Sequence, residues 1–199
     1  MTPTVHAAHH GTLLPAPWIV RFAHLVPPGA RVLDVACGEG RHARFFAARR
    51  CTVLAVDRDA VALSALASVA NVETRTADLE TGLWPLGNER FDAIVVVNYL
   101  HRPLFVPLLA ALAPEGALLY DTFARGNEAY GRPSNPDFLL ERDELLQRVA
   151  GRLTVVAFEQ GCVIESERKA VVQRIAAVGT ARGWPPPLNA PEAQAEQVE

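Results

Sequence analysis

The chain has 199 residues, of which 50% are hydrophobic and 21% are charged, a composition typical of one globular domain with a sizeable core. Its formal net charge of −3 at pH 7 gives no overall attraction to nucleic acid or to an anionic membrane surface. The sequence has no signal-peptide pattern and no hydrophobic run near the roughly 18 residues of a membrane span. We therefore expect a soluble, cytoplasmic protein with no membrane contact and no preference for nucleic acid.

The beginning and end of the chain differ from its middle. We expect a flexible lead-in over residues 1–16, one domain over 17–180 and a disordered tail over 181–199. Pro17 suits the first position of a helix, which predicts a short helix that buries its hydrophobic side.

Strands and helices alternate along the middle of the chain. The hydrophobic pattern predicts strands at 31–36, 52–57, 72–78, 91–97 and 116–123, with helices at 41–50, 59–69 and 103–114. Such alternation is typical of a parallel sheet that is covered by helices on both faces.

The last part of the domain departs from this alternation. A helix is expected at 141–150, followed by strands at 153–160 and 170–178. About ten residues between these strands are too few for a crossover helix, so the strands should pair antiparallel. The prediction is an α/β, Rossmann-like three-layer sandwich, with a seven-stranded, mostly parallel sheet and an antiparallel last strand.

A glycine-rich turn follows the first of these strands. Gly38, Gly40 and Ala43 fit a G-x-G-x-x-A pattern between strand and helix, and Asp57 follows about 20 residues later. This pattern by itself fits an NAD-binding site, as in an NAD-dependent oxidoreductase.

Two further carboxylates favour a different ligand. Asp34 lies inside the first strand, where an unpaired carboxylate is costly and would repel a pyrophosphate. Asp78 follows the third strand, where it could accept a hydrogen bond from an adenine amino group. Carboxylates at the ends of three consecutive strands suit a ligand with an ammonium group, a ribose and an adenine.

Five motifs then carry a family resemblance. VLDVACGEG, VLAVD, TADLE, FDAIVVVNYL and LAPEGALLYDT resemble, in order, the motifs of the class I S-adenosylmethionine-dependent methyltransferases over about residues 30–178. The stretch CGEGRHARFFAARRCTVLAVDRD is similar to the bacterial TehB-like branch, whereas NYLHRPLF departs from TehB. The resemblance implies S-adenosyl-L-methionine as cofactor, and gives no support to tellurite chemistry.

The resemblance also implies which residues bind the cofactor. They are Asp34, Ala36, Cys37, Gly38, Gly40, Arg41, Asp57, Arg58, Asp78, Leu79, Asn98 and Tyr99. Asp34 would hold the ammonium group, directly or through backbone and water, and Asp57 the ribose hydroxyls. Asp78 and the Leu79 amide would bind the adenine, which Arg58 would flank. The N-terminus of the next helix favours the cofactor's carboxylate.

The acceptor side of the site is expected after the fourth strand. Asn98 and Tyr99 would lie near the reactive methyl group, with Tyr99 orienting the acceptor. His101 is the candidate general base, because a histidine titrates near neutral pH; the alternative is that it packs or caps the next helix. The stretch lacks the Asn-Pro-Pro-Tyr pattern of many nucleobase amino methyltransferases, which disfavours such acceptors.

A polar loop over 125–137 follows the fifth strand. Arg125 and Arg132 could bind an anionic acceptor, or the loop could simply be solvated. His6, His9 and His10 precede any predicted element, and the three scattered cysteines lack metal-ligand spacing, so no metal site is expected.

The function predicted from the sequence is S-adenosylmethionine-dependent methyl transfer to a small-molecule acceptor. An S-adenosylmethionine-binding subunit that performs no transfer is the alternative, and an NAD-dependent oxidoreductase is a more distant one. The sequence leaves the oligomeric state, monomer or homodimer, open.

Overall fold

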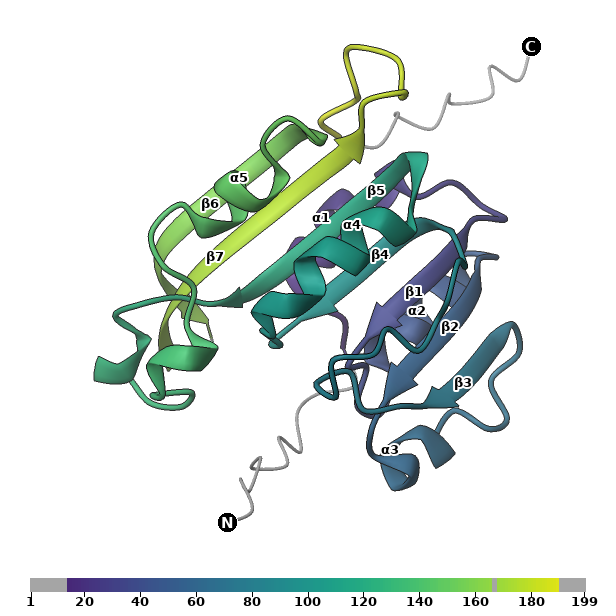
Figure 1. The fold of residues 1–199 in the computed structure, drawn as a ribbon, viewed down its shortest axis with the longest axis horizontal. Helices are drawn as coiled ribbons and strands as arrows, with labels where there is room; N and C mark the ends of the chain where they lie inside the picture. The colour runs from purple at the N-terminus through teal and green to yellow at the C-terminus, as the bar shows by residue number, and fades with distance from the viewer. Residues whose placement is uncertain (1–13, 166–167, 190–199) are drawn as a thin grey trace, which may run out of the picture.

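The computed structural model describes residues 14–165 and 168–189. Their core is one seven-stranded sheet with the order β3-β2-β1-β4-β5-β7-β6 (Figure 1). The strands are β1 (Arg31–Val35), β2 (Thr52–Asp57), β3 (Val72–Thr76), β4 (Phe91–Val97), β5 (Leu112–Phe123), β6 (Leu153–Glu165) and β7 (Arg168–Gly179).

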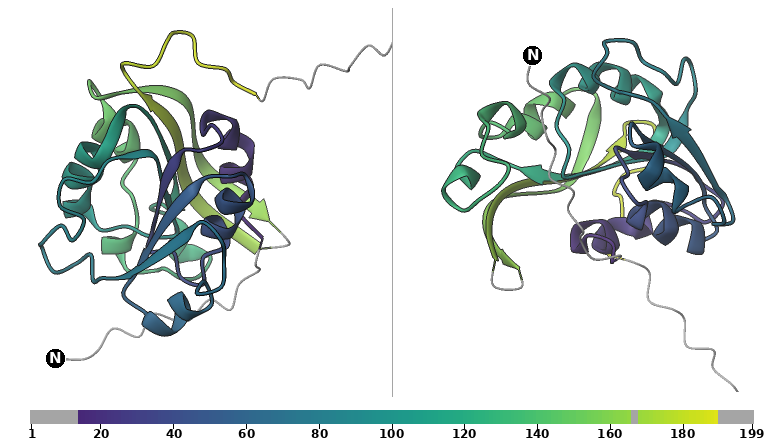
Figure 2. Two further views of the ribbon diagram at one scale, coloured as in Figure 1. Left: turned by 90° about the vertical axis from the view of Figure 1, so that its right-hand side faces the viewer. Right: turned by 90° about the horizontal axis from the view of Figure 1, so that it is seen from below.

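Helices cover both faces of this sheet, as its edge-on view shows (Figure 2, right). One face carries α1 (Pro17–Phe22), η1 (Ala23–Leu25), α2 (Arg41–Ala48) and α3 (Ala60–Ser64). The other carries η2 (Arg102–Leu104), α4 (Phe105–Ala111) and α5 (Glu144–Val149). The short helices η3 (Asn127–Ala129) and η4 (Pro136–Phe138) lie in the loop after β5. The three-layer sandwich predicted from the sequence is confirmed.

The pairing of the strands also agrees with the prediction. β1 to β5 are parallel, whereas β7 pairs antiparallel with both β5 and β6. The apolar side chains of the central strands are buried on both faces, as expected for parallel strands that lie between two helical layers.

Some elements begin or end elsewhere than expected. α3 ends at Ser64, whose Oγ donates to the Val61 carbonyl oxygen over 2.6 Å, a bond that competes with helix continuation. β5 begins at Leu112 because Pro114 cannot extend the preceding helix. α5 begins only at Glu144, since Asp143 has a left-handed φ of 60°.

The described parts of the two terminal segments contact the domain. Ala16 is buried, and its backbone N–H donates to Nε2 of His42 over 3.2 Å. Arg182 donates to the carbonyl oxygens of Glu115 and Leu25, each over 2.9 Å. Arg182 thus ties the start of the segment 181–189 to the domain, whereas Trp184 and Leu188 in the same segment are exposed. Residues 1–13, with His6, His9 and His10, and residues 190–199 lie outside the described part of the chain.

The lengths of the helices bear on membrane association. None of the helices within residues 14–165 and 168–189 is long and apolar enough to cross a membrane.

Candidate active site

The predicted site residues share one edge of the sheet. The chain runs outward from β1 to β2 and β3, then returns to β4 on the other side of β1 (Figure 1). The carboxyl ends of these parallel strands thus flank a switch point in strand order, the place where open α/β sheets bind their ligands. Asp34, Asp57, Asp78 and Asn98 lie in or just beyond these strand ends.

The loop from β1 to α2 has left-handed backbone at Ala36, Gly38 and Gly40, with φ of 50°, 55° and 77°. A Cβ added at Gly38 would meet no protein atom within 4 Å, whereas one at Gly40 would lie 2.4 Å from Cδ1 of Leu66. Gly40 is therefore required by packing. At Gly38 the space beside the backbone is open, as a site for a closely approaching ligand needs.

Asp34 is a buried carboxylate that the protein only partly satisfies. The residue is 2% exposed, and Oδ2 accepts a hydrogen bond of 2.9 Å from the backbone N–H of Ala43. Among the described residues, Oδ1 has no hydrogen-bond donor. Burial raises the pKa of Asp34 to about 7, although the Ala43 hydrogen bond and the Arg41 charge oppose the shift. A cationic group at this oxygen would stabilise the ionised form.

Asp57 connects the ends of β1 and β2. Its Oδ2 accepts from the Gly38 backbone N–H over 2.8 Å, and its Oδ1 from the Asp59 N–H over 2.9 Å. These bonds fix the carboxylate against the glycine loop. Each oxygen keeps a second lone pair, which a ribose hydroxyl would need.

The residues after β3 provide one exposed carboxylate and one buried apolar side chain. Oδ1 of Asp78 accepts from the Glu80 backbone N–H over 2.9 Å, and Leu79 is 6% exposed. This turn has the acceptor and the apolar surface that an adenine ring would need.

Two further predicted residues lie in the glycine loop. Burial raises the pKa of the Cys37 thiol, and the charges of Asp34 and Asp57 raise it further, so this cysteine is an unreactive thiol. Arg41 is half-buried, and burial lowers the pKa of its guanidinium, whereas Asp34 and Asp121 raise it.

Tyr99 lies within electrostatic reach of the charged residues Asp78, Glu80 and Arg58. Burial raises the pKa of its hydroxyl, and the nearby carboxylates of Glu80 and Asp78 raise it further. Arg58, whose charge lowers that pKa, lies on the same side. A phenol with a raised pKa donates hydrogen bonds and does not accept protons at neutral pH, which favours an orienting role for Tyr99.

His101 follows in the same stretch. It is half-buried, and its side chain makes no hydrogen bond with any described residue. The imidazole does not cap the following helix η2, so both ring nitrogens are available to a ligand. The preceding Asn98 is exposed, with a left-handed φ of 57°.

Two residues not predicted from the sequence hold this stretch in place. The Tyr120 hydroxyl donates to the Tyr99 carbonyl oxygen over 2.9 Å. Arg102 binds both carboxylate oxygens of the buried Glu144, at 3.0 and 2.9 Å, and the carbonyl oxygens of Asp137 and Leu139 at 2.8 Å. Arg102 thus joins the segment after β4 to residues 137–144 on the acceptor side.

The loop over 125–137 uses much of its polarity internally. Arg125 pairs with Glu141 at 2.9 Å. Asn127 is buried, donates to the Pro133 carbonyl oxygen over 3.0 Å and accepts from the Val171 N–H over 3.1 Å. Asn135 caps η4. Arg132 remains exposed without a described ion pair.

A buried ion pair also lies at this edge and was not predicted. Nε of Arg174 on β7 contacts Oδ1 of Asp121 on β5 at 3.0 Å, and both side chains are about nine-tenths buried. The two residues are directly paired in the sheet register, which explains why sequence proximity gave no sign of them.

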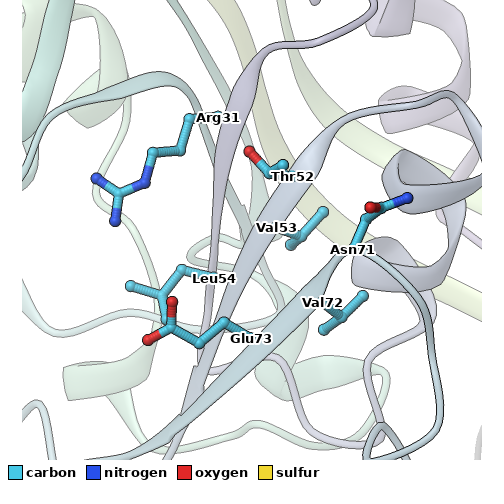
Figure 3. A pocket seen from close by; sticks show the side chains of 7 residues that line it. All are labelled: Arg31, Thr52, Val53, Leu54, Asn71, Val72 and Glu73. Atoms are coloured by element: carbon cyan, nitrogen blue, oxygen red, sulfur yellow. The ribbon is translucent and has the colours of Figure 1, made fainter.

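A cavity of about 320 Å³ lies away from these residues, at the amino ends of β1, β2 and β3 (Figure 3). Arg31 and Glu73 line it together with Val53, Leu54 and Val72. Arg31 is already paired with Glu89, and none of the predicted site residues lines the cavity. We assign it no role in the site. Within residues 14–165 and 168–189, no cluster of His, Cys, Asp or Glu could hold a metal ion.

Comparison with known proteins bears on the class of protein. Residues 32–116 match the family model described as "Methyltransferase domain". A sequence search of curated proteins gives no match. Many solved structures share the fold.

Three of these structures show the range of the similarity. TehB from Haemophilus influenzae has a TM-score of 0.66 at 18% identity, over 79% of this chain and 59% of the TehB chain, so this chain spans well under two thirds of TehB. A 1,6-didemethyltoxoflavin N1-methyltransferase from Burkholderia thailandensis, solved with that compound and S-adenosylhomocysteine, has a TM-score of 0.61 at 20% identity, over 82% and 76%. The [4+2]-cyclase SpnF has a TM-score of 0.62 at 14% identity, over 81% and 78%.

The domain match and the fold define the class. Residues 32–116 match a methyltransferase domain, and the described chain has the fold of the class I S-adenosylmethionine-dependent methyltransferases that the sequence resembles. The Burkholderia enzyme, which shares this fold, was solved with S-adenosylhomocysteine, the product form of the cofactor predicted from the sequence. The cyclase shares the fold, so the fold by itself does not decide the reaction.

Proposed function

We propose that this protein transfers a methyl group from S-adenosylmethionine to a small molecule. The observation that carries the proposal is the carboxyl edge of the sheet. There the glycine loop is open at Gly38, the buried Asp34 has an oxygen without a donor, and Asp57 is hydrogen-bonded to the loop. These groups suit a ligand that has an ammonium and a ribose and carries no phosphate.

Different residues would bind different parts of the cofactor. Asp34 would hold the ammonium, Asp57 the ribose hydroxyls, and Asp78 with the Leu79 amide the adenine. Bound S-adenosylmethionine supplies an electrophilic methyl group on a positively charged sulfur. The protein then needs chiefly to orient an acceptor in line with that methyl group.

The acceptor side would be formed by the segment after β4. Tyr99 would orient the acceptor, and His101 would remove a proton from an oxygen or nitrogen acceptor as the methyl group arrives. The unbonded His101 side chain supports this role. A small-molecule acceptor is favoured by the 1,6-didemethyltoxoflavin N1-methyltransferase with the same fold and by the net charge of −3.

The test is methyl transfer from methyl-labelled S-adenosylmethionine to cell extract separated into small-molecule and macromolecular fractions. We expect label in the small-molecule fraction with the wild-type protein, and less than a tenth as much with His101→Ala or, at S-adenosylmethionine concentrations below saturation, with Asp57→Ala. Label in protein or nucleic acid alone would contradict the small-molecule acceptor. Binding of S-adenosylhomocysteine without transfer to any fraction would favour the subunit that binds the cofactor and performs no transfer.

A further inference from the structure

The segment that carries His101 is attached to the rest of the domain at two points. At the first, the hydroxyl of Tyr120 on β5 donates to the Tyr99 carbonyl oxygen over 2.9 Å. At the second, Arg102, the residue after His101, binds both carboxylate oxygens of Glu144 at the start of α5, at 3.0 and 2.9 Å. The candidate base therefore lies between two anchored positions.

The two attachment points are themselves connected. The Tyr120 ring stacks on the ring of Phe105, the first residue of α4, with the centroids 5.6 Å apart. The Arg148 guanidinium lies 4.9 Å from the centroid of the Phe105 ring and binds Glu144 at 2.7 Å. Because Glu144 also binds Arg102, these contacts form a closed ring that returns to the segment after β4. We refer to Arg102, Phe105, Tyr120, Glu144 and Arg148 as the support ring.

Glu144 is the centre of the support ring. It is buried, and it accepts from Arg102, from Arg148 and from the Glu141 backbone N–H over 3.0 Å. Burial by itself would raise the pKa of Glu144, but the hydrogen bonds from the two arginines lower it below its ordinary value. Desolvation offsets much of the attraction in a buried ion pair, so such a pair is weak evidence of stability and can instead specify a conformation.

Arg102 also holds the end of the loop that follows β5. Its guanidinium donates to the carbonyl oxygens of Asp137 and Leu139, each over 2.8 Å. One side chain therefore binds the segment after β4, the start of α5 and the loop between them and β5. A displacement of Glu144 would move the candidate base and this loop together.

We propose that Tyr120, and Glu144 acting through Arg102, are positioning residues that fix His101 relative to the loop 125–137 and so shape the acceptor site. This inference rests on the proposed function, in which His101 takes the proton of the acceptor. A general base works only within hydrogen-bond reach of that proton, and a misplacement of about 1 Å costs roughly 100-fold in rate. The support ring thus acts on transfer without touching the acceptor.

Three variants disturb the support ring to different degrees. Tyr120→Phe removes one hydroxyl, Arg102→Lys keeps the charge without the planar fork, and Glu144→Gln removes the charge at the centre. Glu89→Gln is the matched control, because Glu89 is also a carboxylate between two arginines, at the opposite edge of the sheet.

Three measurements separate position from stability. The first is methyl transfer from labelled S-adenosylmethionine to the small-molecule fraction of cell extract. The second is calorimetric affinity for S-adenosylhomocysteine. The third is the NMR titration of the histidine side chains, in which the His101 signal is the one of six that His101→Ala removes.

Methyl transfer should fall about three- to tenfold in Tyr120→Phe, the range for one lost hydrogen bond, and at least about tenfold in Arg102→Lys and Glu144→Gln. The affinity for S-adenosylhomocysteine should stay within about twofold of wild type in all three. The His101 signal should shift in all three, and in Tyr120→Phe the shift reports position, because that variant changes no charge. Glu89→Gln should change neither transfer nor the His101 signal.

Two results would overturn the inference while the proposed function stands. One is unchanged methyl transfer, or an unmoved His101 signal, in Tyr120→Phe and Arg102→Lys, which decide the matter even where Glu144→Gln does not fold. The other is an equal loss of transfer in Glu89→Gln, which would mean that the support ring contributes stability alone. If wild type transfers label to no fraction, the proposed function itself fails, and the inference fails with it.

Discussion

We predict that the buried carboxylate of Asp34 makes cofactor binding depend on pH near neutrality. Burial raises the pKa of Asp34 to about 7 in the free protein, so the side chain is largely protonated at pH 6 and ionised at pH 8. An ammonium beside it favours the ionised form and lowers the pKa in the complex. At pH 6, Asp34 must therefore lose a proton when the cofactor binds.

The size of the effect follows from this pKa. With a value of about 7, roughly a tenth of the carboxylate is ionised at pH 6 and about nine-tenths at pH 8. The affinity for S-adenosylhomocysteine should then rise about tenfold from pH 6 to pH 8 and level off above. The sign is that of an acid whose pKa falls on binding, so affinity increases as pH rises.

Calorimetric titrations at pH 6, 7 and 8 measure this dependence directly. Repeating the pH 6 titration in buffers with different ionisation enthalpies counts the released protons, and we expect about one per cofactor. Asp34→Asn should bind more weakly at pH 8, with an affinity nearly flat between pH 6 and pH 8. An affinity of wild type that is flat over this range, or a slope that persists in Asp34→Asn, would refute the reasoning.

Three other features give stability predictions. Burial, together with the Arg41 charge, lowers the pKa of His42 to about 3. The contribution of His42 to stability is therefore complete above its unfolded pKa of about 6.5 and is lost as pH falls. In denaturant unfolding, wild type should lose about 2 kcal/mol of stability relative to His42→Asn between pH 7 and pH 5. Gly38→Ala should lower the affinity for S-adenosylhomocysteine at least about tenfold and the free energy of unfolding by about 1 kcal/mol, whereas Gly29→Ala, at the opposite edge of the sheet, should lose only the same stability. Gly40→Ala should lower the free energy of unfolding by about 2 to 4 kcal/mol. Equal affinity losses at positions 38 and 29 would contradict the open-loop argument. Arg102→Ala, which leaves the buried Glu144 unpaired, should lower the free energy of unfolding by about 3 kcal/mol, and a loss under about 1 kcal/mol would show that the pair is not structural.

The gathering of Asp34 and Asp57 at one edge of the sheet was predictable because it depends on local pattern. Asp34 and Asp57 lie at the ends of strands that could be recognised from hydrophobic runs, and parallel strands bring their carboxyl ends together. The strand pattern and the short connection between the last two strands were likewise enough to predict the antiparallel pair. No tertiary information was needed for either inference.

The supports of the acceptor side were not predictable in this way. Arg102 and Glu144 are 42 residues apart, and Asp121 and Arg174 are 53 apart. Each pair meets only after several strands have assembled, so no spacing in the sequence indicates it. Arg125 is the opposite case. The sequence allowed it to bind an anionic acceptor, but in the structure its guanidinium is paired with Glu141.

Helix ends were the least predictable part of the fold. The left-handed backbone of Asp143 delays α5, and the Ser64 hydroxyl ends α3 early. Both are single-residue effects that a hydrophobic pattern averaged over several turns does not register.

The identity of the cofactor is the central claim, and its most direct test is calorimetric titration of wild type and Asp57→Ala with S-adenosylhomocysteine and with NAD. We predict saturable binding of one S-adenosylhomocysteine per chain, at least tenfold weaker in Asp57→Ala because the ribose loses its carboxylate acceptor, and no binding of NAD. Binding of NAD to the wild-type protein, without binding of S-adenosylhomocysteine, would contradict the account.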